Sequence, residues 1–140
     1  MLLNLDFRTY QQTSLHYIIA LVCLTLSALL AIHGFQLLRR EGMLDSRRSD
    51  PTLLWVEQTT VLVTVGAYKY VRHPLYCSFL MLIWGSFLLV PSWQGGLLAL
   101  FSSLNIILAA RVEEQENLLY FGTAYSDYMN RTKMFIPFVI

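Results

Sequence analysis

The sequence predicts an all-α integral membrane protein with about three transmembrane helices, one N-terminal span followed by a helical hairpin. Of the 140 residues, 56% are hydrophobic and only 14% are charged, and the mean hydropathy is +0.51. A domain of this size has too much surface to hide so many apolar side chains in a soluble core. Long uncharged stretches supply candidate membrane helices instead. We therefore expect the whole chain to form a single membrane domain.

The first predicted span covers residues 15–38, which contain no acid, Lys or Arg. As a helix this stretch would be about 36 Å long, enough to cross a hydrocarbon layer of about 30 Å with some tilt. Arg39 and Arg40 follow directly and end the apolar run. No small-residue cleavage site follows it, so we interpret the segment as an uncleaved anchor, with residues 1–14 at the membrane interface.

The second and third spans form the predicted hairpin. Residues 75–110 contain no Asp, Glu, Lys, Arg or His. Within them, 91–96 has the proline and glycine content of a turn, so helices over 75–90 and 97–112 would run antiparallel. Pro74 suits the first turn of a helix, where its missing N–H needs no partner. Each apolar arm is about 24 Å long, which is short for a full span unless the helix extends past its apolar limits.

Two polar segments, residues 39–74 and 113–140, flank the hairpin. The first segment and everything after Ala110 hold nine of the ten Lys and Arg residues. Basic residues mark the cytoplasmic side of a membrane. We therefore predict a cytoplasmic loop and a cytoplasmic C-terminal tail, with the N-terminus outside, in the inner membrane of a bacterium. Residues 59–65 are β-branched, but a lone strand would lack a partner, so a short helix or an ordered loop is favoured there.

Composition and spacing also exclude several classes of function. The net charge of +1 gives no indication of a nucleic-acid partner. The three histidines are scattered, and Cys23 and Cys77 lie far from any useful ligand spacing, so we expect no metal site. The sequence contains neither a glycine-rich phosphate loop nor a serine nucleophile motif.

Two polar clusters at the ends of the hairpin indicate a site at the membrane–water boundary. Arg72 and His73 precede the second helix, and Glu113 and Glu114 follow the third. An antiparallel hairpin returns its two ends to the same membrane face. Taken singly, each cluster has an ordinary explanation. Bases anchor helix ends at the interface, glutamates pair with neighbours on a helix surface, and tyrosines form aromatic belts.

Taken together and in order, these residues resemble one known superfamily. The motifs are Gly66-x-Tyr68, Arg72-His73-Pro74-Leu75-Tyr76, Gly85, Glu113-Glu114, Phe121-Gly122-x-x-Tyr125-x-x-Tyr128 and Ile136-Pro137. The set resembles the isoprenylcysteine carboxyl methyltransferase and phospholipid methyltransferase superfamily over roughly residues 60–140. That resemblance implies a membrane-embedded enzyme that uses S-adenosylmethionine, bound by the loop, the start of the second helix and the tail.

The resemblance also implies roles for individual residues. Arg72 and His73, beside a helix N-terminus, would suit the cofactor's carboxylate. The glutamates would suit its ammonium or ribose, and tyrosines could flank adenine or the sulfonium. Arg111 is the predicted catalytic residue, orienting an anionic acceptor. The predicted cofactor-binding residues are Gly66, Tyr68, Arg72, His73, Pro74, Tyr76, Gly85, Glu113, Glu114 and Tyr125, with Tyr128 a further aromatic candidate and helix packing an alternative role for Gly85.

The leading hypothesis is therefore methyl transfer from S-adenosylmethionine to a lipophilic acceptor: a hydrophobic carboxylate, a lipid amine or a hydrophobic thiol. The acceptor and membrane lipids would be its partners. An NADPH-dependent reductase of the related sterol reductase branch is one alternative, although the contiguous Arg-His-Pro-x-Tyr string favours the methyltransferase branch. A non-catalytic membrane adaptor is another, because members of the superfamily commonly have four or more spans. With three, this chain would complete its acceptor pocket by forming a homo-oligomer, or would keep the pocket small and open.

Overall fold

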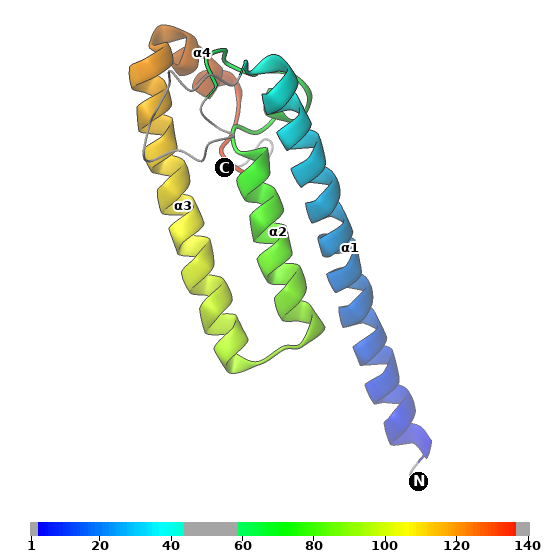
Figure 1. Cartoon of the computed structure of the whole chain (residues 1–140). Coiled ribbons are helices and arrows are strands. Elements are labelled where there is room, and N and C mark those ends of the chain that lie inside the picture. Colours follow the sequence, from blue (N-terminus) through cyan, green and yellow to red (C-terminus); the bar gives the residue numbers. More distant parts are fainter. Residues whose placement is uncertain (1–2, 44–58, 137–140) are drawn as a thin grey trace.

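A computed structural model describes residues 3–43 and 59–136, with side chains from residue 15 onward. The described chain is helical, which confirms the predicted fold class (Figure 1). In order, its elements are α1 (Leu3–Glu41), the short 3-10 helix η1 (Gly66–Lys69), α2 (Pro74–Leu89), α3 (Trp93–Phe121) and α4 (Thr123–Arg131).

The three long helices stand side by side, with α2 between α1 and α3 (Figure 1). Helix α1 packs closely along α2, whereas α3 contacts α2 much less extensively. Gly85 of α2 permits the close approach, because a Cβ there would lie 3.1 Å from Cys23 and Leu24 of α1. Ser27 of α1 also donates a hydrogen bond of 2.7 Å to the Ser78 carbonyl of α2. Small residues at such contacts are typical of membrane helix pairs.

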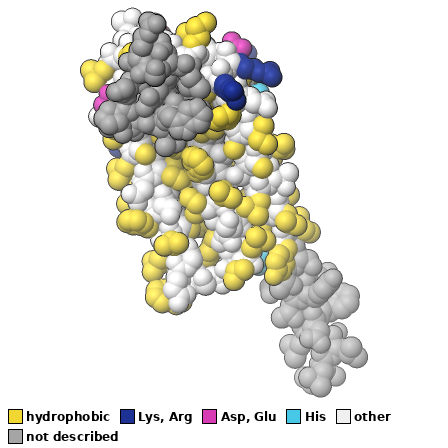
Figure 2. Space-filling model, in the orientation of Figure 1, with side chains coloured by type: hydrophobic (Ala, Val, Ile, Leu, Met, Phe, Trp, Pro, Cys, Tyr) yellow, Lys and Arg dark blue, Asp and Glu magenta, His cyan; other side chains and the backbone are white. Residues whose placement is uncertain are grey.

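Two of these helices are long and apolar enough to cross a membrane, over Leu15–Glu41 and Trp93–Phe121. Pro74–Leu89 is a shorter apolar helix of 16 residues, about 24 Å in length. Apolar side chains cover the helical body, and charged side chains gather at one end of it (Figure 2). The described part of the chain therefore has the helices of a small multi-span membrane protein, as the sequence predicts.

Several predicted boundaries differ from the observed ones. Helix α3 begins at Trp93, inside the predicted turn, and continues to Phe121, so the segment from residue 113 onward begins as helix. Glutamate, glutamine and leucine all favour helix, so α3 continues after it leaves the apolar layer. The first charged residues after the apolar run therefore do not mark the end of α3. At its start, the Ser92 hydroxyl accepts a hydrogen bond of 3.1 Å from the Gly95 amide, which caps the helix.

The other boundaries concern the N-terminal helix and the loop. Helix α1 begins at Leu3 and runs without a break through the predicted boundary between residues 14 and 15. The interfacial location of residues 1–14 stays a prediction. Residues 59–65 form an irregular segment without a helix, in agreement with the ordered-loop alternative. Most of the remaining predicted cytoplasmic loop, residues 44–58, lies outside the described residues.

The polar segments gather at the end of the bundle where α1 ends and α2 begins (Figure 1). Residues after α4 run beside the segment before α2, forming a parallel bridge between Val71 and Lys133. The Arg72 amide donates to the Lys133 carbonyl at 2.8 Å, and the Lys133 amide donates to the Tyr70 carbonyl at 3.3 Å. Gly122 allows the turn between α3 and α4, since its φ of 60° favours glycine. The C-terminal segment is thereby fixed against the start of α2.

Candidate functional site

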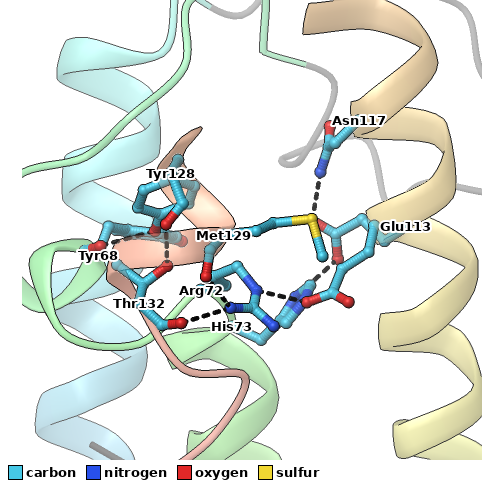
Figure 3. A network of polar contacts seen from close by, with 9 residues as sticks. Tyr68, Arg72, His73, Glu113, Asn117, Tyr128, Met129 and Thr132 are labelled. Atoms are coloured by element: carbon cyan, nitrogen blue, oxygen red, sulfur yellow. Dashed lines mark hydrogen bonds and ion pairs between the residues drawn. The ribbon is translucent and has the colours of Figure 1, made fainter. Parts of the chain in front are cut away.

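Arg72 lies at the centre of a polar network at this end of the bundle (Figure 3). Its Nε donates to Oε1 of Glu114 on α3 at 2.5 Å. Its Nη1 donates to the carbonyl oxygens of Thr132, at 2.6 Å, and Met129, at 3.2 Å. One guanidinium thus joins the segment before α2, helix α3 and the end of α4. Its donors at Nε and Nη1 bind protein atoms, not a ligand.

His73 is buried between two carboxylates and is 3% exposed. Its Nδ1 lies 3.3 Å from Oε2 of Glu113, and its Nε2 lies 3.3 Å from Oε1 of Glu114. Burial lowers the pKa of the imidazole, but the two adjacent carboxylates outweigh that effect and raise the pKa to about 9. His73 is therefore a cation at neutral pH, and both ring nitrogens face glutamates.

The two glutamates have different surroundings, although they are neighbours in the sequence. Glu114 accepts from Arg72 and lies against His73, behind the cavity described below. Glu113 lines that cavity. Its Oε1 accepts a hydrogen bond of 3.3 Å from Nδ2 of the Asn117 side chain. Its Oε2 is buried and within ion-pair distance of His73, but it has no partner with hydrogen-bond geometry among the described residues. Glu113 therefore pairs with His73 and still lines the cavity, whereas Glu114 pairs with both Arg72 and His73.

Three tyrosines surround the network. The Tyr128 hydroxyl donates a hydrogen bond of 2.6 Å to the Tyr68 carbonyl, which joins α4 to η1. The rings of Tyr125 and Tyr128 lie with centroids 5.8 Å apart. Burial and the nearby glutamates raise the pKa of Tyr125 well above its usual value, and burial raises that of Tyr128. Both phenols are therefore neutral and present aromatic faces and hydroxyl groups at physiological pH.

A cavity lies where these elements meet. It holds about 40 Å³ of space for the centres of water molecules, and with the open space at its mouth the hollow amounts to about 450 Å³. The hollow can hold only a few waters, because one water needs about 10–15 Å³ by this measure. The polar and aromatic lining consists of Tyr68, Arg72, His73, Glu113, Asn117, Phe121, Tyr125 and Tyr128; Leu38, Thr59, Leu62, Val63 and Leu75 complete the wall.

The structure thus brings together most of the predicted site. Tyr68, Arg72, His73, Glu113 and Tyr125 all line the cavity. Glu114 supports them from behind.

Two further predicted residues lie in the layer beneath the network. Pro74 is fully buried in the first turn of α2. Tyr76 is buried, with its ring centroid 5.4 Å from that of His73.

Three predicted residues lie elsewhere. A Cβ on Gly66 would collide with Leu37 and His33 of α1, so this glycine permits a close loop–helix contact at a φ of 60°. Gly85 lies along α2 against α1, in the helix contact expected for the packing role, and its contact with the cofactor stays a prediction. Arg111 is exposed on α3, one helical turn before Glu114.

Sequence reasoning missed two polar contributors. Asn117 follows Glu113 by four residues, which is one helical turn, so the spacing could have predicted their contact once α3 was known to continue. Thr132 supplies a carbonyl to Arg72 and donates its hydroxyl to the Tyr128 carbonyl at 2.6 Å. No local sequence signal indicates that contact, because it depends on where the C-terminal segment returns.

Comparison with known proteins identifies the family. The family model described as "Phospholipid methyltransferase" matches residues 15–124, most of the chain. The chain belongs to this family. The matched range contains the Arg72–His73 and Glu113–Glu114 clusters and confirms the resemblance that the motifs indicated.

Curated relatives of this phospholipid methyltransferase family member include two kinds of methyltransferase. A methanethiol S-methyltransferase of Pseudomonas deceptionensis is 32% identical over 116 residues, covering 81% of this chain and 41% of that protein. A methanethiol S-methyltransferase of Bradyrhizobium diazoefficiens is 38% identical over 72 residues, covering 50% of this chain and 26% of that protein. The protein-S-isoprenylcysteine O-methyltransferase of Schizosaccharomyces pombe is 29% identical over 143 residues, covering 99% of this chain and 54% of that protein. The chain thus spans about a quarter to a half of the length of these relatives, and no solved structure matches it.

Proposed function

We propose that this chain is an S-adenosylmethionine-dependent methyltransferase that modifies a lipophilic acceptor at a membrane surface. The proposal depends on one observation: the two charged clusters contact each other beside one cavity. Arg72 and His73 precede α2, and Glu113 and Glu114 lie on α3. The family membership and the thiol and carboxyl methyltransferases among its relatives support the same reaction class.

The donor set at the cavity suits this cofactor. Oε2 of Glu113 accepts no hydrogen bond from the described residues, although it lies 3.3 Å from Nδ1 of His73, and it is a buried acceptor suited to the ammonium group or a ribose hydroxyl. Neutral Tyr125 and Tyr128 offer ring faces for adenine or for the sulfonium. When bound, the cofactor supplies a methyl group on a positively charged sulfur, which becomes a neutral thioether after transfer.

The two cations serve a positioning role in this proposal. Arg72 and His73 hold Glu114 in place, and His73 also orients Glu113. This differs from the predicted role of both cations as ligands of the cofactor carboxylate, and it is supported by the protein acceptors that face Nε and Nη1 of Arg72 and both ring nitrogens of His73. His73 is protonated and lies between two carboxylates, so it is poorly suited to serve as a general base. An acceptor that is already an anion would need no such base.

The cavity must enlarge to admit the cofactor. Its volume of about 40 Å³ is far below the roughly 300–1,000 Å³ of typical small-molecule sites. Leu62 and Val63 form part of the wall in an irregular segment that lacks helical hydrogen bonds. We propose that this segment moves outward when the cofactor binds, while the network on α2, α3 and α4 stays in place.

The same proposal includes the orientation of the chain and a role for Arg111. The charged end of the bundle would face the cytoplasm, in the inner membrane of a bacterium, because most of the described basic residues, among them Arg39, Arg40 and Arg72, lie there. Arg111, exposed on α3 near this end, would meet an anionic acceptor before it reaches the cavity.

Equilibrium binding of radiolabelled S-adenosylmethionine to the purified chain in detergent tests the function directly. Glu113→Gln replaces the carboxylate that lines the cavity with a neutral group of the same shape, so we expect affinity to fall about 10–100-fold. Asp127→Asn, an equal charge change at an exposed position of α4, is the matched control and should bind normally. Binding of NADPH in place of S-adenosylmethionine would contradict the proposal in favour of a reductase, and binding of neither would favour an adaptor.

A further inference from the structure

A second and larger hollow lies outside the polar network, between α1 and α2. It has a volume of about 860 Å³, within the range of small-molecule sites. Its apolar wall includes Ala31, Ile32 and Phe35 of α1 and Phe79 of α2. These residues belong to the apolar parts of two membrane helices, so the groove is open to the hydrocarbon side of the bundle.

The charged end of the groove has one sign. Arg39 and Arg40, in the last turn of α1, both line it, and both are exposed. Among the described residues that line the groove, none is acidic. Glu41 follows Arg40 along the helix but does not line the hollow. The groove therefore combines a long apolar surface with a cationic end, which complements a molecule with an apolar chain and an anionic head.

One residue connects this groove with the cavity of the proposed active site. Leu75, the second residue of α2, lines both hollows. It packs closely against Gly34 of α1, where a Cβ would lie 3.1 Å from its Cδ2. The groove and the polar cavity are thus neighbours separated by the Leu75 side chain.

We propose that the α1–α2 groove binds the acceptor, and that Arg39 and Arg40 select acceptors that carry an anionic head group on a single apolar chain. This inference rests on the proposed methyl transfer, because it assigns the acceptor of that reaction. The groove is much larger than a small thiol requires. Its two arginines would add nothing to the binding of a neutral thiol, but they would stabilise a carboxylate at the membrane interface.

Photolabelling without cofactor tests the inference separately from catalysis. The purified chain in nanodiscs of phosphatidylcholine is irradiated with a palmitic acid analogue that carries a mid-chain diazirine, and in parallel with the matching alcohol. We expect adducts on peptides that contain residues 31–40 and 75–79, with the acid labelling about tenfold more than the alcohol. Equal labelling by acid and alcohol, or adducts spread evenly over α1, α2 and α3, would overturn the inference.

Two variants sharpen the result. The double substitution Arg39→Gln/Arg40→Gln should lower labelling by the acid about tenfold, to the level of the alcohol. Arg131→Gln/Lys133→Gln, which removes the same two charges at exposed positions in and just after α4, should leave it unchanged. Ile32→Trp fills the groove without changing charge and should reduce labelling by both probes; undiminished labelling in this variant would also overturn the inference.

Cofactor binding measured on the same samples separates the two proposals. Normal S-adenosylmethionine binding with unselective labelling would overturn the groove assignment alone. Selective labelling without S-adenosylmethionine binding would overturn the proposed function and leave the groove as a binding site for anionic amphiphiles.

Discussion

The two helix contacts of the bundle are built differently. Along α1 and α2, apolar side chains and small residues such as Gly85 pack over a long interface. Helix α3 contacts α2 much less, and its charged end is tied to the rest by Glu113 and Glu114 through His73 and Arg72. The comparison indicates that packing holds α1 against α2, whereas the polar network holds α3. The network therefore has two functions, since it fixes a helix and forms the cavity.

The largest effect should come from Glu114→Gln. The change removes the counter-ion that half-buried Arg72 and buried His73 share, and leaves His73 paired with Glu113 alone. Breaking a buried ion pair by removing one partner costs about 3–5 kcal/mol. We expect a loss of this order in the free energy of unfolding, together with loss of S-adenosylmethionine binding. Denaturant titration in detergent would measure it, with Gln115→Ala, at the exposed neighbouring position, as control. An unchanged unfolding midpoint would show that packing alone holds α3.

Next in size is the dependence of stability on pH. The folded-state pKa of His73 is raised from 6.5 to about 9, so its contribution is fully present below pH 6.5 and is lost as the pH rises through 9. The loss should be on the order of 3 kcal/mol, at about 1.4 kcal/mol per pKa unit. Unfolding measured between pH 6 and pH 10 would show it.

A His73→Gln variant is the control for that titration. Glutamine keeps a polar side chain but does not titrate, so most of the slope should disappear in this variant. A slope of equal size in both proteins would assign the titration to another group and contradict the observed ion pairs as its source.

The smallest effect on stability should come from Gly85, which lies in the packed contact between α1 and α2. In Gly85→Ala the added methyl would lie 3.1 Å from Cys23 and Leu24, closer than ordinary contact. We expect a destabilisation of about 1–3 kcal/mol at most, with unchanged affinity for S-adenosylmethionine. Unfolding and binding measured on one preparation would test both halves. A selective loss of cofactor affinity would restore the role that the motif assigned to this glycine.

The sequence predicted the helical fold and most of the site because these depend on local features. Uncharged runs of sufficient length specify membrane helices, and an antiparallel hairpin brings Arg72 and His73 back to Glu113 and Glu114. It could not say which glutamate faces the cavity, since that depends on the rotation of α3 about its axis. It also could not predict that Arg72 binds the Thr132 and Met129 carbonyls, because that contact requires the C-terminal segment to return beside residue 71.

The role of Gly85 shows a further limit of sequence reasoning. A glycine at a fixed distance from a motif is consistent with both cofactor contact and helix packing. Only the position of α1 against α2 distinguishes the two. The end of α3 was mispredicted for a related reason, since the end of an apolar run marks where the membrane ends and not where the helix does.

An experimental structure of the chain with S-adenosylhomocysteine tests the central claim most directly. We expect the ligand in the enlarged cavity, with a polar group hydrogen-bonded to Oε2 of Glu113, the adenine against Tyr125 or Tyr128, and Arg72 still bound to Glu114. A ligand bound away from Glu113, or one that separates Arg72 from Glu114, would contradict it.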